Sequence, residues 1–198
     1  GRLERGFHGS ISTIFGGAVA AGVLLDLTQG QMTQAIALAA TSIGGLHVAA
    51  NTSVAREYHA GNSALLGVNA ALAARKGFIA EEHVLEMPRG FFSAYGGSHL
   101  EDVTRDLGGS WDIVTNMAVK LVPGGHPHHA AAEAAAKGAI PGNVKPDDVV
   151  SIVVSAAKYR TIPGPARPTD LIGVAHSPTY FVAAGVADKG YGSIHAPP

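Results

Sequence analysis

The stretch that decides the fold is residues 6–27, GFHGSISTIFGGAVAAGVLLDL. From Ser12 to Leu25 it is rich in alanine and glycine, and five bulky apolar residues recur at helical spacing: Ile14, Phe15, Val19, Val23 and Leu24. This spacing predicts a helix that places several apolar side chains on one face. For residues 35–50, the alanine- and glycine-containing composition predicts a helix packed tightly against other helices, because these small residues let two backbones approach closely.

Two further helices are expected downstream. Thr28 and Gln31 have the spacing of a capping box, which predicts a helix from Gln29 to about Gly44. A third helix should begin near Asn62 and end at Gly77, after two basic residues that suit a helix C-terminus. Short loops separate the three segments, so the first half is predicted to be mainly α.

The second half has a mixed pattern. An alanine-rich helix is expected over 127–136, and a helix capped by Ser177 or Thr179 should run to Val186. The β-branched run within 147–156 predicts a strand. We therefore expect this half to be α+β.

Composition excludes several classes of function. Apolar residues make up 46% of the chain and charged residues 15%, which indicates a globular protein with surfaces suited to meeting other protein. A net charge of −1 gives no basic field for nucleic acid or an anionic membrane, and the least polar stretch, 35–50, falls short of a membrane span. The absence of cysteine excludes thiolate chemistry and fits a reducing compartment, so we expect a cytoplasmic protein.

Ten histidines are the main chemical signal, because imidazole exchanges protons near neutral pH. His8 lies between Phe7 and Gly9 directly before the first helix; it is either an acid/base or carboxylate-binding group, or a residue that only packs the loop. Residues 56–62, REYHAGN, combine Arg56, Tyr58 and His59. The guanidinium can hold a carboxylate through two hydrogen bonds, or the segment is a solvated turn with a local Arg-Glu pair.

A second candidate cluster surrounds a glycine-rich turn. Lys120 precedes VPGGHPHH, residues 122–129, in which His126 is the first of three histidines. Either Lys120 and one histidine face an anionic ligand, or the loop is exposed and has no functional role. Zinc is disfavoured, because histidines so close in sequence seldom converge on one ion. No phosphate loop, dinucleotide fingerprint or nucleophile elbow is present, so no metal or other cofactor is expected.

The ordered motifs resemble the MmgE/PrpD family, whose members dehydrate, decarboxylate or epimerise small polycarboxylic acids without a cofactor. A Gly-aromatic-His loop enters an alanine-rich helix at residues 6–18, and it is followed by 34–36, 44–46, 56–62 and 72–78 in the family's order. Residues 120–123 and 126–135 are similar to the start of the family's lid domain. The resemblance implies a mainly α fold: part of a helical domain over residues 1–115, then a smaller α+β lid domain over 116–198 that is incomplete.

The resemblance also implies site residues. His8, Lys120 and His59 match catalytic positions, and Arg56, Tyr58, His126 and again Lys120 are expected to bind substrate. One departure is Arg56, which stands where the family's Lys-x-x-His-x-Gly motif has lysine; it keeps the charge but changes reach and hydrogen-bond geometry.

Both ends of the chain, residues 1–6 and 196–198, predict a piece of a longer or split protein. The family's helical domain begins upstream of His8, and that part carries an aspartate and a histidine that complete the site. We therefore expect a lyase (dehydratase or decarboxylase) or an isomerase that needs the rest of the fold, as a homodimer or with another polypeptide. The alternative is a non-catalytic structural or regulatory subunit of such an assembly.

Overall fold

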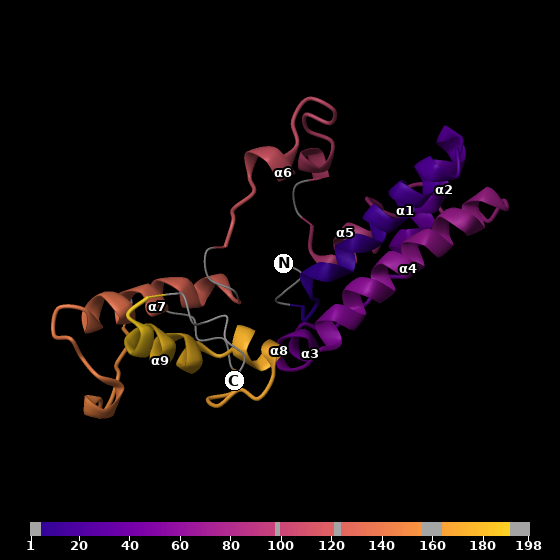
Figure 1. Ribbon diagram of the computed structural model, residues 1–198. Helices are drawn as coiled ribbons and strands as arrows, with labels where there is room; N and C mark the ends of the chain where they lie inside the picture. The colour runs from indigo at the N-terminus through magenta and orange to yellow at the C-terminus, as the bar shows by residue number, and fades with distance from the viewer. Residues whose placement is uncertain (1–4, 98–99, 121–123, 156–163, 191–198) are drawn as a thin grey trace. The chain divides into compact units, whose positions relative to one another are not determined.

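The computed structural model describes residues 5–97, 100–120, 124–155 and 164–190. By its internal contacts the chain divides into two units, Gly1–Trp111 and Asp112–Pro198. The elements of both units in the described ranges are helices (Figure 1). The prediction of a mainly α fold is confirmed.

The first unit is built on three helices, α1 (Thr13–Leu24), α2 (Gln29–Ala40) and α4 (Ala55–Arg75). In Figure 1, α1 lies along α4. Shorter elements complete the unit: η1 (Gly9–Ser12), α3 (His47–Thr52), α5 (Phe91–Tyr95) and η2 (Leu100–Val103). Helix α1 follows the predicted range, and α2 begins at the predicted residue but ends at Ala40, four residues before Gly44. Thr28 and Gln31 form the predicted capping box.

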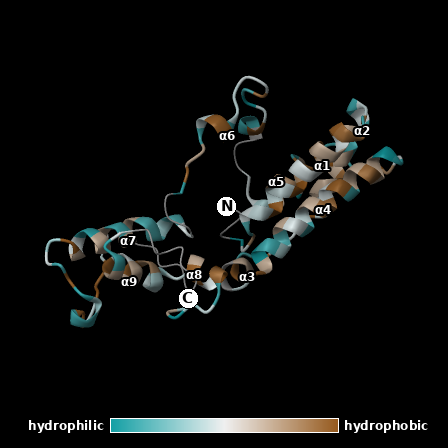
Figure 2. Cartoon of the chain, in the orientation of Figure 1, coloured by the Kyte–Doolittle hydropathy of each residue, from teal (hydrophilic) through white to brown (hydrophobic). Residues whose placement is uncertain are grey.

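Small residues allow α1 and α4 to pack closely. A methyl group on Gly17 would lie 2.6 Å from the carbonyl oxygen of Ala64, and one on Gly67 would collide with the carbonyl oxygen of Ile14. Ile14 and Ala18 are fully buried at this crossing. Figure 2 shows α1 in white to brown along most of its length, in keeping with its apolar sequence. The close approach of the two backbones therefore depends on these two glycines.

The predicted start of the third helix was wrong. Helix α4 begins at Ala55, seven residues before Asn62, so Arg56, Tyr58 and His59 lie in its first two turns and not in a preceding turn. No side chain caps this helix at Val54, which is why no capping signal marked its start. Because residues three apart lie on one side of a helix, Arg56 and His59 are neighbours on α4.

The second unit contains α6 (Asp112–Thr115), α7 (His126–Ala139), η3 (Pro146–Asp148), α8 (Leu171–Ala175) and α9 (Pro178–Asp188). Helix α7 packs on α9: a methyl group on Gly185 would lie 2.5 Å from the carbonyl oxygen of Ala132, and Phe181 is fully buried between them. The predicted cap holds, since Ser177 Oγ accepts the Tyr180 amide at 3.0 Å.

The strand predicted over 147–156 is not formed in its described part, 147–155. Residues 146–148 form the 3-10 turn η3, and 149–155 have neither helical nor strand structure. Five residues of this run, Val149, Val150, Ser151, Ile152 and Val154, line an open pocket of about 480 Å³ together with residues 178–183 of α9. Residues 150–155 are exposed, Val150 fully and Val153 to 87%, and β-branched composition alone does not form a strand where no partner strand is present among the described residues. The α+β character of the lid stays a prediction.

Candidate functional site

The loop that carries His8 is tied to a second loop in the first unit. Phe7 and Leu46 form an isolated antiparallel bridge, in which the His8 amide donates to the Gly45 carbonyl at 3.1 Å and the His47 amide donates to the Gly6 carbonyl at 2.8 Å. These bonds hold residues 6–8 beside residues 45–47. His8 and His47 are therefore placed on adjacent backbone segments.

Gly45 is the point on which this arrangement depends. Its φ of +143° is a backbone conformation that L-residues with a side chain rarely adopt. A methyl group there would lie 3.0 Å from Ile11 Cγ2 and 3.2 Å from both Cγ and Nδ1 of His59. Glycine thus lets the His59 ring and the buried Ile11 side chain pack directly on the backbone.

The His8 ring is oriented by its neighbours. Its Nδ1 lies 2.7 Å from the Ser10 hydroxyl oxygen and accepts the Ser10 amide at 3.2 Å, which caps η1. Its face stacks on the ring of His47, with centroids 5.8 Å apart and planes inclined by 20°. His8 and His47 are both half-buried.

Three histidines consequently lie at or beside Gly45: His8 through its backbone amide, His47 two residues along the chain, and His59 through its ring. His8 and His47 come from the two bridged loops, and His59 reaches the same glycine from α4. The Nδ1 of His59 is buried and has no hydrogen-bond partner among the described residues. A buried nitrogen of this kind costs free energy unless a further group satisfies it, so its position marks the His59 ring as a candidate for proton exchange or ligand contact.

The other predicted residues of the first unit lie on the same helix as His59. Arg56 donates from Nε and Nη2 to Glu57 Oε1, at 3.0 and 2.7 Å, and both side chains are partly exposed. Tyr58 is 71% exposed and its ring centroid lies 6.4 Å from that of His59. The sequence left two interpretations of this segment, a carboxylate-binding Arg56 or a local pair between Arg56 and Glu57. The local pair is present in the structure.

An aromatic cluster supports the His8 loop from its other side. The rings of Phe7 and Tyr95 meet edge to face at 4.6 Å, and Tyr95 Oη donates to the Ile43 carbonyl at 3.0 Å. Burial raises the pKa of Tyr95, so the phenol remains a proton donor at neutral pH. Arg5 Nη1 donates to the carbonyls of Ser93 and Ala94 at 2.7 and 2.6 Å. Helix α5 thus holds both loops in place.

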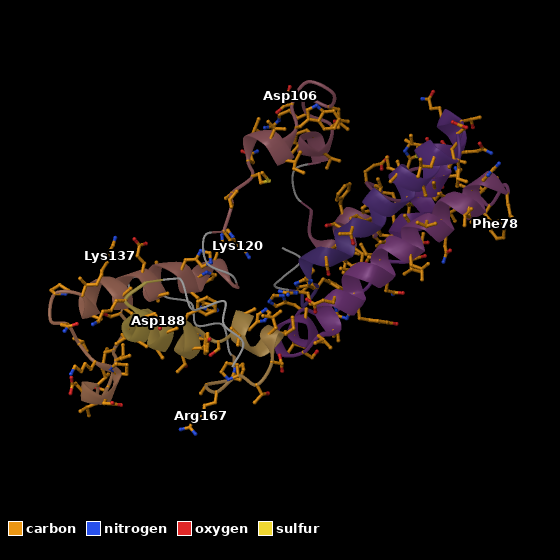
Figure 3. All side chains as sticks on the ribbon, in the orientation of Figure 1. Phe78, Asp106, Lys120, Lys137, Arg167 and Asp188 are labelled. Atoms are coloured by element: carbon orange, nitrogen blue, oxygen red, sulfur yellow. The ribbon has the colours of Figure 1, made fainter. Side chains whose placement is uncertain are left out.

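Lys120 and His126 belong to the second unit (Figure 3 labels Lys120). Lys120 is exposed, and its Nζ donates to the Gly124 carbonyl at 2.8 Å. His126 is the first residue of α7 and stacks on His129 with ring centroids 5.3 Å apart. Both side chains therefore lie near the N-terminus of α7, whose dipole favours nearby anions.

His128, in the same turn, has a structural role. It is 1% exposed, its ring packs against Phe181 with centroids 5.5 Å apart, and neither ring nitrogen has a partner among the described residues. Burial lowers the pKa of His128, and the neighbouring His176 and His129 lower it further. Its neutral form belongs to the core between α7 and α9.

The structure thus collects two predicted residues, His8 and His59, around Gly45, and adds His47, which the sequence reasoning missed. The sequence around His47 has no pattern that would mark it. His47 lies next to His8 only because the backbone bridge between Phe7 and Leu46 brings the two loops together. The joint assignment of the six predicted residues to one site stays a prediction.

The described residues show neither a metal site nor a membrane helix. Across residues 5–97, 100–120, 124–155 and 164–190, no three His, Asp or Glu side chains are grouped so that they could hold a metal ion. Within the same ranges, no helix combines the length and the hydropathy needed to cross a membrane.

Comparison with known protein families gives a match over the first half of the chain. The profile of the MmgE/PrpD N-terminal domain matches residues 1–102, which is more than half of the 198 residues. The matched segment contains the His8 loop, Gly45 and the first turns of α4. No curated protein matches the chain.

Proposed function

The chain belongs to the MmgE/PrpD family, and on that premise we propose that it forms part of a lyase or isomerase acting on a small di- or tricarboxylic acid. The reaction would begin with proton transfer at the carbon next to a carboxylate and continue as dehydration, decarboxylation or epimerisation. The observations that support this most directly are the stacking of the His8 and His47 rings and the packing of the His59 ring on Gly45, whose carbonyl accepts the His8 amide.

The chemistry requires a proton carrier and a stabiliser of negative charge. When a proton leaves the carbon beside a carboxylate, charge develops on the carboxylate oxygens, and fixed cations or hydrogen-bond donors lower the barrier. In this proposal His8 carries the proton and His59, with its buried Nδ1, assists it. Imidazole is the side chain most often used in general acid and base catalysis, which suits both residues to these roles.

Arg56 and Lys120 are proposed to hold the substrate carboxylates. Arg56 pairs with Glu57 and Lys120 donates to the Gly124 carbonyl, both in partly or fully exposed positions. Exposed contacts of this kind contribute about 0–1 kcal/mol, so exchanging them for a substrate carboxylate costs little. Tyr58 and His126, both exposed, would add hydrogen bonds to the remaining oxygens.

Arg56 is the residue on which substrate choice is proposed to depend. A guanidinium binds a carboxylate through two parallel hydrogen bonds, whereas the ammonium of the lysine that the family motif has would act as a point charge. Arg56→Lys should therefore change the relative kcat/KM for substrates that differ in the position of one carboxylate.

Exposed apolar side chains support the proposal that the chain works in an assembly. Val23 and Leu24 of α1 are 64% and 84% exposed, and Leu65 of α4 is 57% exposed. Large apolar groups in water favour a contact with further protein, either a second copy or a polypeptide that carries the rest of the fold. The same observation favours the second candidate function, a structural subunit whose helices serve only as an interface.

The test is a turnover assay on the purified assembly that contains this chain. A panel of hydroxylated and unsaturated di- and tricarboxylic acids is incubated with the wild-type protein and with His8→Ala, and products are identified by proton NMR. We expect conversion of at least one acid and a loss of about 10²-fold or more in His8→Ala, the range of a positioned proton carrier. His83→Ala is the matched control, because the His83 side chain is exposed and its ring pairs with Glu86, which is not one of the predicted site residues.

Two results would separate the candidates. Conversion that is unaffected by His8→Ala would contradict the assigned role of His8. A stable assembly that converts none of the acids would favour the structural subunit.

A further inference from the structure

We infer that α4 carries a self-complementary seam through which two copies of this chain pair in antiparallel orientation. The seam is a row of exposed residues along α4: Gly61, Leu65, Val68, Leu72 and Arg75. Its three large apolar side chains, at positions 65, 68 and 72, are 57%, 38% and 42% exposed. Apolar groups that lie together in water favour burial against further protein.

The seam residues have the spacing of a coiled coil. Successive members are four, three, four and three residues apart, which is the alternation of the a and d positions in a heptad repeat. Buried residues of the same helix recur with the same spacing on its opposite face, at Ser63, Gly67, Ala70 and Ala74, where α4 packs on α1 and α2. One face of α4 is thus used within the unit, and the seam on the other face has the pattern that a second helix would pack against.

An antiparallel arrangement joins unlike residues across the seam. With a two-fold axis across the middle of the row, Leu65 lies opposite Val68 of the second copy, and Leu72 lies opposite its Gly61. A methyl group on Gly61 would meet nothing within 4 Å, so this position leaves room for the leucine side chain. Each layer of the seam therefore pairs a larger residue with a smaller one.

A parallel arrangement would join like with like. Arg75 would lie opposite Arg75 of the second copy, where two positive charges repel, and two Gly61 residues would face each other across a void. The antiparallel arrangement separates the two arginines by about 25 Å along the helix, because a helix rises 1.5 Å per residue. It places each Arg75 opposite Tyr58 of the other copy, whose ring is 71% exposed and can stack with the guanidinium.

The residues beside the seam also fit a second copy. Asn62 and Asn69 are exposed, and the antiparallel register brings Asn62 of each copy close to Asn69 of the other, where the two amides can exchange hydrogen bonds. Residues 58–74 contain no aspartate, glutamate, lysine or arginine, so this length of α4 offers no charge that would select a charged partner. Because one row supplies both members of every layer, the surface complementary to the seam is the seam itself.

The absence of cysteine from the chain allows a direct test of the register. Gly61→Cys and Leu72→Cys are oxidised under mild conditions, each alone and after co-expression with distinguishable tags. Residues 61 and 72 of different copies lie opposite each other, within reach of a disulfide, whereas two residues 61 or two residues 72 are about 16 Å apart along the helix. We expect at least about tenfold more covalent dimer from the co-expressed pair than from either variant alone.

Sedimentation analysis tests the seam without any cross-link. Leu65→Glu would bury two carboxylates in the central layers, so the dimer dissociation constant should rise about 100-fold or more. Leu24→Glu is the matched control, because it changes an 84% exposed leucine of α1 that lies outside the seam, and its dissociation constant should stay near that of wild type. Hydrogen exchange of α1 checks that both variants are folded.

Four outcomes would overturn the inference. Equal cross-linking of Leu72→Cys alone and of the co-expressed pair would reject the antiparallel register. A wild-type protein that sediments as a single chain, or a Leu65→Glu dimer as tight as wild type, would reject the seam. A co-purifying polypeptide of different sequence that is lost in Leu65→Glu would assign the seam to that partner instead. None of these measurements uses a substrate, so the proposed function stands or falls separately.

Discussion

Gly45→Ala should loosen the first unit, because Gly45 is the residue against which Ile11 and His59 pack. Its φ of +143° would place an alanine in a strained conformation, which costs about 1–3 kcal/mol. The added methyl group would lie 3.0 Å from Ile11 Cγ2 and 3.2 Å from the His59 ring, and such overpacking costs about 1–3 kcal/mol more. Reduced freedom of the unfolded chain offsets about 0.4–1 kcal/mol.

The expected net loss is therefore about 3 kcal/mol, within a range of about 1–5 kcal/mol. Amide hydrogen exchange, followed by mass spectrometry, measures this loss in the free energy of unfolding of the first unit. The slowest amides of α1 report it, because they exchange only when the unit unfolds. A loss of 3 kcal/mol should speed that exchange by about two orders of magnitude. Turnover should fall with it, because the His59 ring has to move.

Gly44→Ala is the matched control. A methyl group on Gly44 meets nothing within 4 Å, and its φ is not in the positive range. Exchange of α1 in this variant should stay close to wild type. If Gly45→Ala and Gly44→Ala exchange at the same rate, the packing of His59 and Ile11 on Gly45 is refuted.

Three further predictions follow from the packing. Gly67→Ala should destabilise the first unit by at least about 2 kcal/mol in urea unfolding, because its methyl group meets rigid backbone of α1, whereas Gly61→Ala on the same helix meets nothing and should be nearly neutral. Tyr95→Phe should cost about 0.5–1.5 kcal/mol by leaving the Ile43 carbonyl without its donor, which is read from the same unfolding curves. The pKa of His128 is lowered below 6.5, so the unfolded chain binds its proton more readily; the second unit should lose stability as the pH falls below about 6.5 and level off below the folded-state pKa. His128→Leu should remove this pH dependence in melting experiments between pH 7.5 and 5, and an unchanged dependence would refute the assignment.

The helices of the first unit could be predicted because their signals are local. The apolar spacing of α1 and the Thr28–Gln31 capping box act within a few residues, and both appear in the structure. The start of α4 could not be predicted, because Val54 provides no cap and the helix begins in a polar segment. The strand expected over 147–156 illustrates the opposite error, since β-branched composition depends on a partner strand or on packing, and residues 150–155 are exposed and form no strand.

The candidate site was only partly predictable. His8 could be identified because glycines lie on both sides of it in the sequence. His59 could be identified because Arg56 and Tyr58 lie close to it. His47 did not, because its relation to His8 arises from a backbone bridge between residues 39 positions apart, Phe7 and Leu46. The role of Gly45 was equally hidden, since a positive φ and the approach of His59 both appear only once α4 packs beside the loop.

The central claim is that His8 moves a proton at the carbon beside a carboxylate. Its most direct test is to incubate the assembled protein with the acids of the panel in D₂O and to follow deuterium entry at that carbon by NMR. The account predicts enzyme-dependent deuterium entry into at least one acid or its product, and its loss in His8→Ala but not in His83→Ala. Deuterium entry that persists undiminished in His8→Ala would contradict it.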